Sequence, residues 1–157
     1  MDETNFNAAV DRYADTVYRI AYQNMQNAAD AEDITQDVFV KCLEHRDFND
    51  EQHLKAWLIR VTINRCRDAH KSFWRRYKTT LTDDITAIDA ECQHVFDELA
   101  KLPPKQRNVL YLHCYEGYTI AEIAKILHAN ANTVGSWLNR AKKCLRQQLT
   151  EGGYVND

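Results

Sequence analysis

The sequence predicts an all-α protein with two small helical domains that are joined by a flexible linker. Only four of its 157 residues are Gly and two are Pro, so long stretches lack the residues that usually end helices. Apolar side chains recur at helical spacing in two blocks, separated by a stretch that is rich in Thr and Asp. We therefore expect a first domain at residues 1–76, a linker at residues 77–94, a second domain at residues 95–150 and a tail at residues 151–157.

The apolar spacing places three helices in the first domain: residues 5–25, a second helix that runs from a cap at Asn27 to about Glu44, and a third that runs from about His53 past Phe73. Asn27 is predicted to cap the second helix, because an Asn side chain can accept a hydrogen bond from the first turn. Leu43 is predicted to lie on the inner face of that helix. The polar residues 45–52 are expected to form a loop. Trp57 falls on the apolar side of the third helix, which places it in the core.

Proline and glycine mark the first helices of the second domain. A helix is expected from about Val95 until the pair Pro103 and Pro104 interrupts the apolar pattern. Pro104 suits the first turn of the next helix, where its missing N–H is not needed. Gly117 is predicted to end that helix in a left-handed conformation.

Two capping signals in the last third of the chain predict a helix-turn-helix. Thr119 and Glu122 form a capping box that opens a short helix ending near Leu127, and Asn130 can cap a longer basic helix that runs to about Leu149. In this motif the second helix enters the major groove of DNA, where Asn and Arg read base edges and Lys neutralises phosphates. The predicted DNA contacts are Thr119, Asn132, Thr133, Ser136, Asn139, Arg140 and Lys143. A plain helical hairpin with a basic outer face is the alternative.

Charge alternates along the chain although the net charge is only −3. Residues 1–50 carry eleven acidic and four basic side chains, whereas residues 51–78 carry eight basic and two acidic ones. Residues 79–99 carry six acidic side chains and no basic one, and residues 100–157 are basic again. Alternating blocks favour separate surfaces for separate partners, although each block alone also fits a solvated helix face.

These motifs resemble two conserved regions of bacterial sigma factors. The resemblance to the second region is carried by NAADAEDITQDVFVKCLEH and HLKAWLIRVTINRCRDAHKSFWRR. The resemblance to the fourth region is carried by FDELAKLPPKQRNVLYLHCYEGYTIAEIAKILHANANTVGSWLNRAKKCLRQQL. The chain is similar to the extracytoplasmic-function subfamily of the sigma-70 family, in which a short linker replaces the third region. The resemblance implies an alternative sigma factor that binds core RNA polymerase and directs promoter recognition and transcription initiation.

The resemblance also implies roles for particular residues. In the family, an acidic helix docks on the clamp helices of the polymerase β′ subunit, and the matching residues are Asp30, Asp33, Gln36, Asp37 and Lys41. The third helix and the loop before it bind the −10 element as single-stranded DNA, and the matching residues are Phe48, Asn49, His53, Lys55, Arg60, Asn64, Arg65 and Arg67. The helix-turn-helix recognises the −35 element. The β flap and an anti-sigma factor are further implied partners.

Two positions depart from the family pattern. Gly135 and Trp137 stand where recognition helices of the family usually carry basic residues. A Gly in a helix interior costs about 0.5–1 kcal/mol relative to Ala, and both departures remove charge from the DNA-facing region. We expect recognition of the −35 element to be altered or weak, or Trp137 to make an apolar contact with DNA or with a protein. Packing of Trp137 on the first domain or the linker is the alternative.

Other functions have less support in the sequence. A two-domain helix-turn-helix regulator that binds duplex DNA without core polymerase is the alternative, but it leaves the acidic second helix unexplained. The sequence has no phosphate-binding loop, no zinc-protease motif and no nucleophile with a base at recognisable spacing, which argues against an enzyme. The five Cys are widely spaced and fit reduced thiols of a cytoplasmic protein. We expect no cofactor, no metal site and no membrane insertion.

Overall fold

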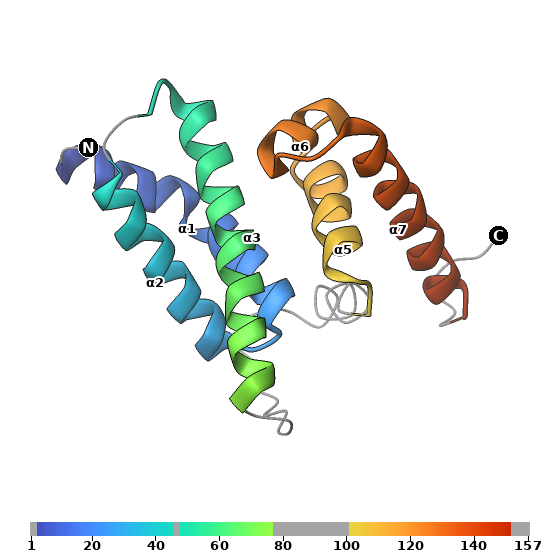
Figure 1. Cartoon of the computed structure of the whole chain (residues 1–157). Coiled ribbons are helices and arrows are strands. Elements are labelled where there is room, and N and C mark those ends of the chain that lie inside the picture. The colour runs from blue at the N-terminus through green and yellow to red at the C-terminus, as the bar shows by residue number, and fades with distance from the viewer. Residues whose placement is uncertain (1–2, 46–47, 77–100, 152–157) are drawn as a thin grey trace. The chain divides into compact units, whose positions relative to one another are not determined.

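The computed structural model describes residues 3–45, 48–76 and 101–151. The chain divides into two compact units, residues 1–86 and 87–157. Figure 1 colours the described helices of the first unit blue to green and those of the second yellow to red. Every regular element in the described ranges is helical, which confirms the predicted all-α class. The predicted linker and most of the helix predicted from Val95 lie outside the described residues, so the predicted domain boundaries stay a prediction.

The described part of the first unit consists of α1 (Glu3–Met25), α2 (Ala28–Glu44) and α3 (Glu51–Arg76). Each of these helices packs against the other two, so that their apolar stripes share one core (Figure 1). Deeply buried side chains of this core include Val17, Ile20, Ala21, Val38, Cys42, Leu58 and Ile59. Trp57 is 8% exposed, which confirms its predicted place in the core.

Side-chain caps set where α2 and α3 begin. Asn27 Oδ1 accepts a hydrogen bond from the Asp30 N–H at 2.8 Å, as the sequence predicted. Asp50 Oδ1 accepts one from the backbone N–H of His53 at 2.7 Å, which is the same kind of cap. Because of this cap, α3 begins at Glu51, two residues before the predicted start. The loop predicted at residues 45–52 therefore ends two residues earlier than predicted, before Glu51.

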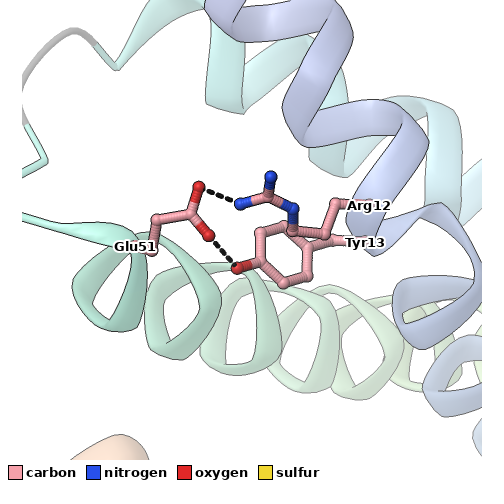
Figure 2. Close-up of polar contacts among 3 residues, drawn as sticks. All are labelled: Arg12, Tyr13 and Glu51. Atoms are coloured by element: carbon pink, nitrogen blue, oxygen red, sulfur yellow. Dashed lines mark hydrogen bonds and ion pairs between the residues drawn. The ribbon is translucent and has the colours of Figure 1, made fainter.

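Glu51 ties the first turn of α3 to α1 (Figure 2). Its carboxylate accepts a hydrogen bond from the Tyr13 hydroxyl at 2.9 Å and forms an ion pair with the exposed Arg12. These contacts hold the pKa of Glu51 below its ordinary value, the hydrogen bond from Tyr13 foremost. Burial raises the pKa of Tyr13, and the hydrogen bond to Glu51 raises the pKa of Arg12. The start of α3 is thereby positioned on α1 by polar contacts as well as by the core.

Leu43 corrects the predicted inner face of α2. Its side chain is 45% exposed, and the inner position near this end of the helix belongs to Cys42 and Phe39. Leu43 follows the buried Val38 by five residues, which is a rotation of about 140° around the helix axis. An apolar side chain at this position therefore points outward, next to Val40, which is 55% exposed.

The described part of the second unit begins with α5 (Pro104–Leu110), which continues into the π-helical turn η1 (Tyr111–Tyr115). Pro104 occupies the first turn of α5, as predicted. Gly117 has φ +81° and so ends this stretch in the left-handed region, also as predicted. The π-helical turn was not predicted. Two backbone bonds close it, from the Glu116 N–H to the Tyr111 carbonyl at 3.2 Å and from the Tyr118 N–H to the Leu112 carbonyl at 3.0 Å.

The helices α6 (Ile120–Leu127) and α7 (Ala131–Glu151) form the predicted helix-turn-helix. The capping box is present, because the Glu122 N–H donates to Thr119 Oγ1 at 3.1 Å and the Thr119 N–H donates to Glu122 Oε1 at 3.0 Å. Asn130 caps α7 through a hydrogen bond from the Asn132 N–H to Oδ1 at 2.8 Å. The buried apolar side chains that join the two helices are Ile123, Ala124, Ile126, Val134, Leu138 and Ala141. Leu127, the last residue of α6, is half buried.

Candidate nucleic-acid interface

One face of α7 presents polar and basic side chains to solvent. Val134, Leu138 and Ala141 point into the second unit, and side chains on the opposite side of the helix are exposed. The exposed set contains all six α7 residues that the sequence predicted as DNA contacts: Asn132, Thr133, Ser136, Asn139, Arg140 and Lys143. Amide, hydroxyl and guanidinium groups on one helix face can meet both base edges and phosphates.

Thr119 lies at the N-terminus of α6 and belongs to the same predicted set. Its oxygen already accepts the Glu122 N–H, so the hydroxyl keeps one proton that a phosphate could accept. The pKa of Glu122 is lowered, chiefly by the hydrogen bond from the Thr119 backbone. The capping box thus orders the N-terminus of α6, an end that favours anions because its N–H groups point outward.

Gly135 and Trp137 lie beside the exposed face of α7, and each faces a neighbouring helix. Gly135 is half buried, and a Cβ built on it would lie 3.9 Å from Cδ1 of Ile120 in α6. Trp137 is half buried, and Lys105 Nζ of α5 lies 5.2 Å from the centroid of its ring. Neither sequence-based alternative for Trp137 included a partner inside the second unit. The two departures from the expected basic residues therefore contact their own unit.

The acidic side of α2 divides into exposed and engaged side chains. Asp33, Gln36 and Lys41 are exposed. Asp30 is half buried and accepts a hydrogen bond from Asn27 Nδ2 at 2.6 Å. Asp37 is half buried and accepts one from Arg65 Nη2 of α3 at 2.8 Å. The last contact joins a residue predicted to dock on polymerase to a residue predicted to bind DNA, which sequence spacing could not show.

Two exposed apolar residues extend the acidic side of α2. Val40 and Leu43 follow Asp33 and Gln36 at helical spacing, so the four lie along one stripe of the helix. We call these four residues the α2 stripe. A contiguous patch of exposed apolar side chains can mark a protein-binding surface. The spacing of Val40 and Leu43 from Asp33 in the sequence already indicated that they share a side of the helix. The stripe was missed because Leu43 was expected to face inward.

The structure divides the residues predicted to bind the −10 element between two sides of α3. His53, Arg60, Asn64 and Arg67 follow one another at intervals of seven, four and three residues and share an outward side. The exposed Lys71 continues this side and was missing from the predicted set. We call these five residues the α3 stripe. Arg67 also forms a 3.8 Å ion pair with Asp68.

Lys55 and Arg65 lie off the α3 stripe. Arg65 is turned toward α2, where it meets Asp37. Lys55 is half buried. Of the predicted residues within α3, four therefore lie on the α3 stripe and two lie off it; Phe48 and Asn49 precede the helix.

Phe48 sits in a cluster of four rings at the start of α3. Its ring centroid lies 4.7 Å from that of His45, 5.4 Å from that of Trp57 and 5.5 Å from that of His53. The Asn49 N–H donates to His53 Nδ1 at 3.0 Å. Phe48 is half buried, so this residue of the predicted −10 set has ring partners within the protein.

Within the described ranges, no three His, Cys, Asp or Glu side chains come close enough to hold a metal ion. None of the helices in the same ranges combines the length and the apolar character that a membrane crossing needs.

Two family models match the chain. The model described as Sigma-70 region 2 matches residues 9–76, and the model described as Sigma-70, region 4 matches residues 95–145. The ECF RNA polymerase sigma factor SigW of Bacillus subtilis is 28% identical in an alignment of 171 positions, which covers 96% of this chain and 91% of that protein. The RNA polymerase sigma-E factor of Streptomyces avermitilis is 32% identical over 146 residues, which cover 86% of this chain and 79% of that protein.

Two solved structures share the fold. The sigma factor RpoE from Bartonella quintana, in complex with the anti-sigma factor NepR, matches with a TM-score of 0.76 and 19% identity over 93% of this chain and 97% of that chain. CnrH, in complex with the cytosolic domain of CnrY, matches with a TM-score of 0.72 and 24% identity over 96% of this chain and 90% of that chain.

Proposed function

The chain belongs to the extracytoplasmic-function group of the sigma-70 family, and we propose that it works through three surfaces, the α2 stripe, the α3 stripe and the exposed face of α7. It is an alternative sigma factor, which binds core RNA polymerase and directs it to promoters. In this activity the protein binds and positions, and the polymerase performs the covalent chemistry.

The observation that carries this function is the presence of both sigma regions, in order, on one chain. A regulator that binds duplex DNA by itself needs the helix-turn-helix but has no use for a second region that matches sigma factors. The regulator alternative is therefore not favoured.

The α2 stripe is the proposed docking surface for the clamp helices of the β′ subunit. Asp33 and Gln36 supply an acidic and polar part that suits a basic partner, and Val40 and Leu43 supply apolar area that docking would remove from water. Asp30, Asp37 and Lys41 border the stripe. Asp30 and Asp37 already have partners in the free protein, so we give them a smaller share of the binding energy.

The α3 stripe and the exposed face of α7 are the proposed DNA surfaces. Arg60, Arg67 and Lys71 would track the phosphates of the opened −10 strand, while the ring cluster around Phe48 meets a base. On α7, Asn139 and Arg140 would read bases of the −35 element.

Relatives of known structure suggest the remaining partner. Both were solved in complex with a partner protein, the anti-sigma factor NepR in one case and the cytosolic domain of CnrY in the other. We extend this to the present chain and propose a cytoplasmic protein that an anti-sigma factor controls. Contact of the second unit with the β flap belongs to the same proposal.

Capture of bacterial core polymerase by the immobilised chain tests the function. The test variant combines Asp33→Lys with Leu43→Asp, which reverses the charge and removes apolar area at the two ends of the α2 stripe. Asp11→Lys is the control for the charge reversal, because it repeats the Asp33→Lys change at an exposed position of α1. We expect the wild-type chain and the control to retain core polymerase and the double variant to lose it. Failure of the wild-type chain to retain core polymerase would overturn the proposed function.

A further inference from the structure

The imidazole of His45 lies against the ring of Phe48 in a tilted orientation, and the backbone of His45 is held by a hydrogen bond. The two ring planes differ by 32° and their centroids are 4.7 Å apart. His45 ends α2 in an extended conformation, and its backbone N–H donates to the Lys41 carbonyl at 2.9 Å. The residue itself is exposed. An exposed imidazole is thus held against an aromatic ring that the proposed function places at the opened DNA strand.

The other two neighbours of Phe48 contact it edge-on. The rings of Trp57 and His53 meet the Phe48 ring at 73° and 68°. Trp57 is part of the core, and His53 is held by the Asn49 N–H. Of these three partners, only His45 is exposed, and its ring makes the smallest angle with that of Phe48. The His45 ring also lies 5.2 Å from the ring of Trp57, at 46°. Because His45 is exposed, it is the partner that can leave while Trp57 and His53 stay in place.

An imidazole is a flat nitrogen heterocycle, and so is a nucleobase. Both stack on aromatic rings, and a base covers more of the ring because it is larger. We propose that His45 holds, in the free protein, the place against Phe48 that an unpaired base of the −10 strand takes in the open promoter. The base displaces His45, which acts as a built-in competitor and sets how tightly single-stranded DNA is bound. This inference rests on the proposed function.

The experiment compares holoenzymes assembled from core polymerase and variant chains. Fluorescence anisotropy measures their affinity for short single-stranded homopolymers of deoxyadenosine, deoxycytidine and deoxythymidine, because stacking tolerates any base. Removal of the competitor in His45→Ala is expected to tighten binding of the best homopolymer by about 3- to 10-fold, the range that one aromatic pair supports. His45→Phe leaves a ring in place and is expected to give no such gain.

Two further variants keep the result interpretable. Phe48→Ala removes the stacking surface, so it should weaken binding, and His45→Ala added to it should bring no further change. Gln52→Ala is the control at an exposed neutral position nearby. Weaker DNA binding by His45→Ala would show that His45 itself contacts DNA. If His45→Ala tightened DNA binding equally in the wild-type and the Phe48→Ala background, His45 and the base would not compete for the ring of Phe48. Either result overturns the inference.

Core binding is measured separately for each variant. If the wild-type chain did not bind core polymerase, the proposed function would be overturned. Full core binding together with an unchanged affinity of His45→Ala for all three homopolymers would overturn only the displacement of His45.

Discussion

The two glycines that flank α6 in the sequence have opposite backbone requirements. Gly117 has φ +81°, where a side chain is strained, whereas Gly135 lies inside α7 outside the left-handed region. A Cβ at Gly135 would make only an ordinary contact, 3.9 Å from Ile120 Cδ1. The structure therefore shows room for a methyl group in a helix interior.

Gly135→Ala is expected to raise the free energy of unfolding of the second unit by about 0.5–1 kcal/mol, because Ala loses less backbone entropy than Gly in a helix. Urea denaturation followed by circular dichroism measures the change. Gly117→Ala is the matched control and should destabilise the protein. A neutral or destabilising Gly135→Ala would mean that α6 and α7 need the bare backbone at this position.

Arg140 and Lys143 share the exposed face of α7 but are expected to act differently on DNA. A guanidinium can bind a guanine edge through two hydrogen bonds, whereas an ammonium neutralises phosphate as a point charge. Arg140→Ala should weaken holoenzyme binding to its preferred −35 element by about 1–3 kcal/mol and relax the preference at one base pair. Lys143→Ala should weaken binding equally for all sequences and lower its salt dependence. Selection from randomised −35 elements at two salt concentrations separates the two. An unchanged preference in Arg140→Ala removes Arg140 from base recognition.

At the scale of elements, the contacts of Glu51 connect α1 to α3 in a way that depends on pH. Folding lowers the pKa of Glu51, through Tyr13 first and Arg12 second. Its contribution to the free energy of unfolding is therefore present above the ordinary carboxylate pKa and is lost as the pH falls through the lower, folded value. Acid should loosen this link while the apolar core stays intact.

Glu51→Gln is expected to flatten the acid side of the stability profile. Between about pH 7 and about pH 3 the wild-type chain should lose more stability than the variant, since Gln does not titrate. Urea midpoints of both chains across this range measure the difference. Glu32→Gln, at an exposed carboxylate of α2 that makes none of these contacts, should behave like the wild type. Parallel profiles for Glu51→Gln and the wild type would contradict the assignment.

The elements that the sequence predicted well are those with local signals. The caps at Asn27, Thr119 and Asn130 each join residues two or three positions apart, so the chain alone specifies them. The helices and the exposed face of α7 followed from apolar spacing for the same reason. These signals were enough for the all-α class and for the helix-turn-helix.

Features that have no cap, turn or apolar-spacing signal in the sequence were missed. Asp37 and Arg65 are 28 positions apart, and their contact needs α2 and α3 to be packed first. The π-helical turn is accompanied by a 2.8 Å hydrogen bond between His113 Nδ1 and the Tyr118 carbonyl, across the chain reversal at Gly117. The His45 contact with Phe48 likewise depends on how α2 ends against α3. Spacing gave no information about any of these.

At the scale of the whole molecule, charge and surface type separate by helix. The first unit contains the acidic and apolar α2 stripe on one helix and the basic α3 stripe on another, and the second unit contains the basic face of α7. A protein that must hold polymerase and DNA together gains from placing the two kinds of surface apart, because a basic DNA face would repel a basic docking partner. The alternating charge blocks in the sequence have this physical meaning in the proposed function.

The location of the α2 stripe in the first unit predicts how the two units behave as separate fragments. Residues 1–86 carry the α2 stripe and should compete with the full chain for core polymerase, while residues 87–157 should compete much more weakly. Competition is measured by displacement of the fluorescently labelled full chain from core polymerase, after circular dichroism has shown that each fragment is helical. The Asp33→Lys, Leu43→Asp form of residues 1–86 serves as the control and should not compete. If helical residues 87–157 competed as well as residues 1–86, the main docking surface would lie in the second unit, and the α2 stripe would have to bind another partner.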